Sequence, residues 1–237
     1  MSFETAAVQP PQDEAGEMSE PLRRDALSGD AKWLVVFLHG LGSNGADLMS
    51  FADYWAKSMP DVAFAAPSAP TPCPDAPGGF QWIPRLPPGH PLLFPEVENA
   101  ADDLQPVIDQ ELTVVGLKAD RLALVGFSQG TLMTLHTGVR QDVAPAALLG
   151  YAGGLVGRDR LADEITCKPP VMLINGGADP IVPASAQKPA LEALQAAGIV
   201  AAGQIMPGLD HSVNADALIL GARFLLSAFD YREKNPV

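Results

Sequence analysis

The sequence predicts one α/β domain built on a doubly wound, mostly parallel sheet with helices on both faces. Two observations carry this prediction. Apolar runs of strand length recur along the chain and alternate with longer segments of helical spacing. Within the 237 residues, no shift of composition between 31 and 230 marks a second domain. Such alternation is typical of parallel strands joined by right-handed helical crossovers.

The apolar runs are continuous rather than alternating, which is the pattern of strands covered on both faces. They predict strands at residues 32 to 40, 62 to 67, 121 to 127, 146 to 154 and 171 to 176, and more weakly at 201 to 208. Helical spacing predicts helices at about 46 to 59, 96 to 115, 129 to 140, 184 to 197 and 213 to 229. In such a sheet the ligand site lies at the carboxyl ends of the strands.

One segment, residues 66 to 95, interrupts the alternation. It is rich in Pro and Gly and yet carries large apolar side chains, namely Phe80, Trp82, Ile83, Leu86, Leu92, Leu93 and Phe94. A loop of this length inside a compact domain is usually functional or disordered, and the apolar residues within this one favour a packed segment. We expect it to form one wall of a pocket, and the alternative is a surface loop that Trp82 attaches to the core.

Composition excludes several classes of partner. The chain has 15 Lys and Arg against 28 Asp and Glu, a formal net charge of −13, and no basic cluster, so nucleic acid is not expected. No apolar run approaches the roughly 20 residues that cross a bilayer, so stable membrane insertion is not expected either. Cys73 and Cys167 lack the spacing of a metal site or a disulfide framework. Free thiols in a reducing cytoplasm are the prediction.

The first 20 residues are acidic and lack the basic start and continuous apolar core of a signal peptide. They predict a disordered tail ahead of a domain at residues 21 to 232.

The segment LVGFSQGTLM, residues 124 to 133, places Ser128 between Gly126 and Gly130 where a strand gives way to a helix. This strand-turn-helix context makes the G-x-S-x-G pattern indicative of a nucleophile. The turn is sharp and strained, so a Cβ at either glycine would collide with its neighbours. A simple helix N-cap is the alternative role for Ser128.

A serine hydroxyl needs a histidine to take its proton and a carboxylate to orient that histidine. Of the four histidines, His39 lies where the backbone turns and is expected to support that loop. His90 lies in the Pro-rich segment, and His136 lies two helical turns beyond the serine. His211, between the last strand and the last helix, is the predicted base, and a loop histidine that makes a capping hydrogen bond is the alternative.

Asp179 is the predicted carboxylate because it follows the strand at 171 to 176. Asp210 adjoins His211 and would point away from the site if His211 points into it. The order Ser128, Asp179, His211 is the chain order of an α/β-hydrolase triad.

The tetrahedral intermediate of acyl transfer also needs donors for its oxyanion. The amide of Gln129 is one candidate, and the amide of Leu41 in HGLGSNG, residues 39 to 45, is the other. A phosphate-binding loop is the alternative for this stretch, but it contains neither a Walker lysine nor a G-x-G-x-x-G pattern.

Five motifs, FLHGLGSNGADL, GGFQWIP, GFSQGTLM, GGADPIVP and GLDHS, occur in an order and spacing that resemble the phospholipase/carboxylesterase family of α/β-hydrolases. This family includes the acyl-protein thioesterases, and the resemblance covers about residues 20 to 230. It implies a catalytic set at the matching positions: Ser128, Asp179, His211 and the amides of Leu41 and Gln129. It also implies that Trp82 lines the acyl site.

Two positions depart from the family pattern. Thr131 stands where the family usually has a second glycine, and Asn175 where it often has a histidine. Neither falls on the predicted triad. The family divides between enzymes that act on palmitoylated proteins and bacterial esterases of small esters, and the PLRRD segment at residues 21 to 25 resembles the bacterial group more.

The sequence therefore predicts a serine carboxylesterase that needs no metal or organic cofactor. An apolar pocket predicts neutral small-molecule esters with short to medium acyl chains, bound by Phe80, Trp82, Ile83, Leu86, Ile181 and Val182. A thioesterase or lysophospholipase with the same triad is the first alternative, and a non-catalytic binding module of the same fold is the second. Apolar residues near the pocket mouth fit either a homodimer or a substrate entrance.

Overall fold

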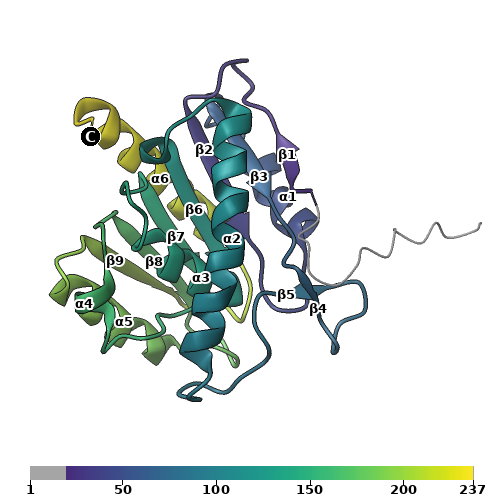
Figure 1. The fold of residues 1–237 in the computed structure, drawn as a ribbon, viewed down its shortest axis with the longest axis vertical. Helices are drawn as coiled ribbons and strands as arrows, with labels where there is room; N and C mark the ends of the chain where they lie inside the picture. Colours follow the sequence, from purple (N-terminus) through teal and green to yellow (C-terminus); the bar gives the residue numbers. More distant parts are fainter. Residues whose placement is uncertain (1–19, 237) are drawn as a thin grey trace, which may run out of the picture.

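The computed structural model describes residues 20–236, which fold around a seven-stranded, strongly twisted sheet with helices on both sides (Figure 1). The strand order is β1-β3-β2-β6-β7-β8-β9. The strands are β1 (Leu22–Arg24), β2 (Trp33–Leu38), β3 (Val62–Ala66), β6 (Leu122–Phe127), β7 (Ala147–Tyr151), β8 (Val171–Gly176) and β9 (Ala201–Met206). All neighbours pair in parallel except β1, which is antiparallel to β3.

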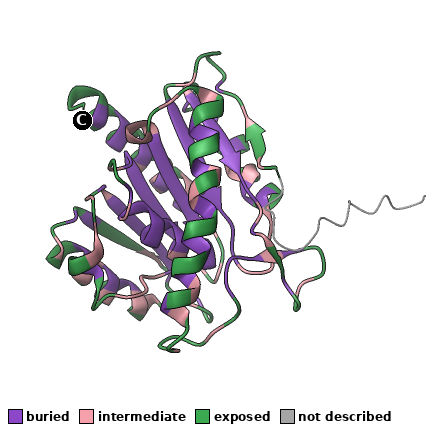
Figure 2. Ribbon diagram, viewed as in Figure 1, coloured by how far each residue is buried: buried purple, intermediate pink, exposed green. Residues whose placement is uncertain are grey.

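The helices divide into two layers, each with its own apolar core against the buried sheet (Figure 2). The helices of one layer are α2 (Leu93–Val115), α3 (Gln129–Gly138), α4 (Leu161–Glu164) and α5 (Gln187–Ala196). Those of the other are α1 (Gly45–Trp55) and α6 (Ala215–Lys234). The predicted doubly wound α/β architecture is confirmed. No helix in the described part of the chain combines the length and apolarity needed to cross a membrane.

The remaining elements are short. A hairpin of β4 (Thr71–Pro72) and β5 (Phe80–Gln81) lies beside the main sheet, and 3-10 turns occupy Ala119–Arg121 and Ala184–Ala186. The Pro-rich segment ends earlier than predicted, because α2 begins at Leu93 and takes Phe94 with it. The predicted acidic tail falls almost wholly outside the described residues.

The carboxyl ends of the parallel strands lie along one edge of the sheet and carry every predicted catalytic segment. The 39–45 loop follows β2, Ser128 follows β6, Asp179 follows β8, and His211 follows β9. Segments up to 172 positions apart in the sequence, from 39 to 211, thus meet at one edge.

The edge strand β1 is held by an ion pair in which the acidic partner is buried. Arg23 donates from Nε and Nη2 to the two carboxylate oxygens of Glu111 on α2, at 2.8 and 2.7 Å. Glu111 is buried, so this bidentate contact supplies the hydrogen bonds that water would otherwise make to its carboxylate. The neighbouring Arg24 pairs instead with Asp53, whose side chain is 64% exposed.

The two arginines should therefore contribute unequally to stability. Arg23→Ala leaves a carboxylate buried without its partner and is expected to lower the free energy of unfolding by about 3 kcal/mol. Arg24→Ala is the matched control, with an expected loss of about 1 kcal/mol or less. Urea denaturation of both variants measures the difference. Equal small losses would mean that Glu111 finds water or another donor when Arg23 is removed.

Candidate active site

Ser128 occupies a strained turn between β6 and α3. Its backbone has φ 54° and ψ −114°, outside the regions that residues with a side chain ordinarily adopt. The neighbouring glycines permit this turn, since a Cβ on Gly126 would collide with the Gly130 carbonyl and a Cβ on Gly130 with the Leu38 carbonyl. The packing thus explains both glycines of the motif and places Ser128 at the amino end of a helix.

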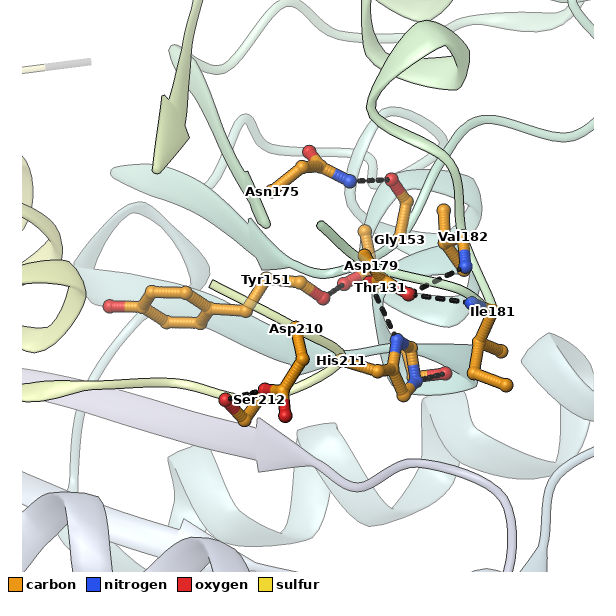
Figure 3. Close-up of polar contacts among 11 residues, drawn as sticks. Thr131, Tyr151, Gly153, Asn175, Asp179, Ile181, Val182, Asp210, His211 and Ser212 are labelled. Atoms are coloured by element: carbon orange, nitrogen blue, oxygen red, sulfur yellow. Dashed lines mark hydrogen bonds and ion pairs between the residues drawn. The ribbon is translucent and has the colours of Figure 1, made fainter. Parts of the chain in front are cut away.

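His211 lies between Ser128 and Asp179. Its Nε2 is 3.0 Å from Ser128 Oγ. Its Nδ1 is 2.7 Å from Asp179 Oδ2 (Figure 3). An ionised carboxylate can only accept, so Nδ1 carries the hydrogen and Nε2 is free to accept the serine proton. The structure therefore brings the three predicted residues together in the geometry that proton transfer requires.

Asp179 is buried, with 7% of its surface exposed, and its second oxygen is also occupied. Oδ1 accepts hydrogen bonds from the amides of Ile181 and Val182 at 2.8 and 2.9 Å (Figure 3). Burial alone would raise the pKa of Asp179, but the hydrogen bonds from His211 and the two amides outweigh it and leave that pKa below its ordinary value. The carboxylate is therefore ionised at neutral pH. Asp210 instead accepts from the Ser212 hydroxyl.

His39 and His136 have other partners in the fold. His39 is buried, and its ring donates to the Gly40 carbonyl at 2.7 Å and accepts from the Ala69 amide at 2.9 Å, which agrees with the predicted loop role. Burial lowers its pKa. Burial, with the nearby Arg140 charge, lowers the pKa of His136 to about 4, and this ring packs against Phe94.

Two backbone amides beside Ser128 are available to an oxyanion. Gln129 is the first residue of α3, so its N–H has no partner within the helix. The Leu41 amide makes no hydrogen bond within residues 20–236. Its loop packs directly on the serine turn, because a Cβ on Gly40 would lie 3.3 Å from the Ser128 Cβ.

The predicted substrate-binding residues separate into two groups. Ile181, 62% exposed, and the half-buried Val182 lie next to the triad through their amide contacts with Asp179. Trp82 and Ile83, 4% and 2% exposed, instead pack into the core beneath α2. Phe80 and Leu86 are half-buried. Residues 80–83 are therefore packed against the core, and direct contact of the predicted side chains with substrate stays a prediction.

Thr131 supports the serine turn in a way that the sequence did not indicate. Its buried hydroxyl lies 2.8 Å from the Tyr151 carbonyl (Figure 3). It also lies 3.0 Å from the Gly126 carbonyl, and so links β6 to β7. Room for this side chain comes from Gly150 and Gly153, where any Cβ would strike Thr131. Thr131, which replaces the usual glycine, is thus accommodated by glycines at the two positions that face it. These glycines are visible in the sequence, but their relation to Thr131 can be recognised only from the folded structure.

Asn175 supports the site from the end of β8. Its buried Nδ2 donates to the Gly153 carbonyl at 2.9 Å (Figure 3), and its Oδ1 accepts from Gln187 Nε2 at 3.0 Å. The side chain therefore ties the loop after β7 to α5. An amide, which both donates and accepts, suits this position.

The fold and the arrangement of Ser128, His211 and Asp179 are those of the α/β-hydrolase class. Comparison with known protein families identifies the family within this class. Residues 26–226 match the model of the Phospholipase/Carboxylesterase family, and the chain belongs to that family, as the five motifs predicted.

Relatives include both esterases and thioesterases. Acyl-protein thioesterase 1 of Gibberella zeae is 30% identical over 207 residues, which are 78% of this chain and 85% of the relative. Esterase YpfH of Escherichia coli is 24% identical over 188 residues, 78% of each chain. The crystal structure of esterase PE8 superposes with a TM-score of 0.84 at 37% identity, covering 90% of this chain and all of that one. The protein is therefore a hydrolase of the esterase and thioesterase group.

Proposed function

We propose that the protein is a serine carboxylesterase whose catalytic triad is Ser128, His211 and Asp179. The observation that carries the proposal is the unbroken hydrogen-bonded path from Ser128 Oγ through the imidazole to the buried carboxylate. The domain that supports this activity spans residues 21 to 232.

In this mechanism His211 Nε2 takes the proton of the Ser128 hydroxyl as Oγ attacks the ester carbonyl carbon. The carbonyl oxygen becomes an oxyanion, which the amides of Leu41 and Gln129 stabilise. The intermediate collapses as the imidazolium returns its proton to the leaving alcohol, which leaves an acyl group on Ser128. His211 then deprotonates a water that attacks this acyl group, and the acid departs as the serine regains its proton. Asp179 holds the imidazole in the required tautomer throughout.

Neutral esters with short to medium acyl chains are the proposed substrates. Apolar residues adjoin the triad: Ile181 and Val182, whose amides bond to Asp179, and Phe127, whose ring centroid is 5.1 Å from that of His211. Trp82 and Ile83 fill the space beneath α2, so a long acyl chain could not extend there without displacing them.

A substrate panel tests this proposal. Steady-state rates are measured on 4-nitrophenyl acetate, butyrate, octanoate and dodecanoate, and on an acetyl thioester, with Ser128→Ala as the background. We expect kcat/KM on acetate or butyrate to exceed that on dodecanoate by about tenfold or more. Equal rates across acyl lengths, or a preference for charged esters, would contradict the proposed pocket.

A thioesterase is the second candidate, favoured by the 30% identity to an acyl-protein thioesterase. The same triad serves both, since only the leaving atom changes from oxygen to sulfur. A thioester rate far above that of the matched oxygen ester would assign the protein to this second class.

The proposed setting is the reducing cytoplasm, supported by two free cysteines, Cys73 buried and Cys167 half-buried. Homodimerisation stays a prediction, which the mass of the native protein in solution would test.

A further inference from the structure

The segment at residues 80–83, here called the bridging segment, is hydrogen-bonded to both of the backbone stretches that carry the proposed oxyanion donors. We infer that it fixes the spacing of these two donors, and that the Gln129 side chain and the Trp82 indole N–H are positioning residues for the oxyanion hole. This inference rests on the proposed function, and it assigns the Pro-rich segment a task beyond lining a pocket.

On one side the bridging segment joins the loop that contains Leu41. The Phe80 carbonyl accepts from the Gly42 amide at 2.8 Å, and the Phe80 amide donates to the Ser43 carbonyl at 2.8 Å. Trp82 Nε1 donates to the His39 carbonyl at 2.9 Å. The contacts lie on both sides of Leu41, so its amide cannot shift without breaking at least one of them.

On the other side the bridging segment joins the residue that supplies the second donor. Gln129 Oε1 accepts from the amides of Trp82 and Ile83 at 2.7 and 3.3 Å, and its Nε2 donates to the Ile83 carbonyl at 2.9 Å. The side chain pairs with Ile83 as a neighbouring strand would. Gln129 is buried, so water does not readily replace these bonds.

Glutamine suits this position because the contact needs an acceptor and a donor on one planar group. A glutamate of nearly the same shape would keep the acceptor but direct a carboxylate oxygen at the Ile83 carbonyl, where no hydrogen is available to either. The backbone amide of residue 129, the oxyanion donor itself, would remain.

The two donor stretches are also packed on each other directly, since a Cβ on Gly130 would collide with the Leu38 carbonyl. Gly79, next to the bridging segment, packs equally closely on the 39–45 loop, where a Cβ would collide with the Gly42 carbonyl. The His39 ring, bonded at both nitrogens, holds the start of the loop. The bridging segment therefore closes a ring of contacts from Gln129 through Trp82 to His39 and back to the serine turn.

Donors aimed at an oxyanion act mainly in the transition state, because the ground-state carbonyl carries little negative charge. A loosened bridging segment should therefore lower kcat while leaving KM nearly unchanged. Substitution of a residue that only contacts the acyl chain would chiefly change KM. Substitution of a residue that only maintains the fold would change neither kcat nor KM of the molecules that remain folded.

The test uses Gln129→Glu, which removes one donor and keeps the shape, and Trp82→Phe, which removes the indole N–H together with part of the ring. The matched controls are Gln141→Glu, a buried glutamine elsewhere on the same layer, and Trp55→Phe, whose indole donates to the Leu218 carbonyl at 3.1 Å in the opposite core. Each variant is assayed on 4-nitrophenyl acetate and titrated with a trifluoromethyl ketone, which adds to the serine to form an oxyanion. Thermal unfolding of each is recorded.

We expect kcat to fall about tenfold or more in both test variants, with the inhibition constant for the ketone raised in parallel and KM within about twofold. The controls should keep native kcat and inhibition. Native kcat and inhibition in both test variants would overturn the inference, as would a rise in KM alone. If Gln129→Glu does not fold, Trp82→Phe decides. Equal activity of native protein and Ser128→Ala would instead refute the proposed function.

Discussion

Replacing Ser128 with alanine is expected to lower kcat on 4-nitrophenyl butyrate by about 10³-fold or more, because the variant has no nucleophile to form the acyl intermediate. The oxyanion donors and the pocket remain, so a residual rate above that of free water is expected. Alanine has the same Cβ as serine, so the strained backbone at φ 54° is no worse in the variant. The folded structure should therefore survive.

The measurement pairs steady-state rates with rapid-quench mass spectrometry of the protein. Native enzyme should carry one acyl group early in turnover, and Ser128→Ala should carry none. Ser50→Ala is the control, since this hydroxyl lies on the exposed surface of α1 and bonds to the Asp47 carbonyl. Native rates in Ser128→Ala would mean that the turn is not a nucleophile site, and would favour a non-catalytic binding module with contaminating activity.

The sheet could be predicted because its strands are buried on both faces and so read as continuous apolar runs. The strand at β9 gave a weaker pattern because Ala202, Gly203 and Gln204 are exposed at the edge of the sheet. The strand β1 has no apolar pattern, since its residues Leu-Arg-Arg are held by pairing with β3 and by the contact of Arg23 with Glu111, 88 positions further along the chain. Contacts this distant in sequence leave no local periodicity.

The candidate site divides in the same way. Ser128, Asp179 and His211 could be predicted because each follows a strand and the order of the three is informative. The roles of the Thr131 hydroxyl and the Gln129 side chain could not, because each depends on a partner brought close only by folding. The presence of Trp at position 82 also does not indicate which way the side chain points, and in the structure its ring packs into the core.

Asp179→Asn should be comparably damaging to loss of the nucleophile, with an expected fall in kcat of about 10⁴-fold. The reason lies in the two amides of Ile181 and Val182, which both donate to Oδ1. They would hold the asparagine oxygen in that place and turn its NH₂ toward His211. Nδ1 would then have to accept and Nε2 would carry the hydrogen, so the imidazole could no longer take the proton from Ser128.

The free energy of unfolding of the native protein should also depend on pH differently from that of Asp179→Asn. The pKa of Asp179 is lower in the folded protein than the ordinary value of about 3.9, so its ionised form stabilises the fold above that value. This contribution is lost as pH falls through the folded pKa. The native protein should therefore lose its stability advantage over Asp179→Asn on acidification, as measured by thermal unfolding at a series of pH values.

Asp210→Asn is the matched control for both measurements, because Asp210 adjoins His211 in sequence but bonds to Ser212 instead. We expect it to change kcat by no more than about threefold, since it leaves the tautomer of His211 untouched. A large loss in Asp210→Asn together with a small one in Asp179→Asn would reverse the two roles. A large loss in both would mean that the charge around His211, rather than the tautomer set by one carboxylate, controls the reaction.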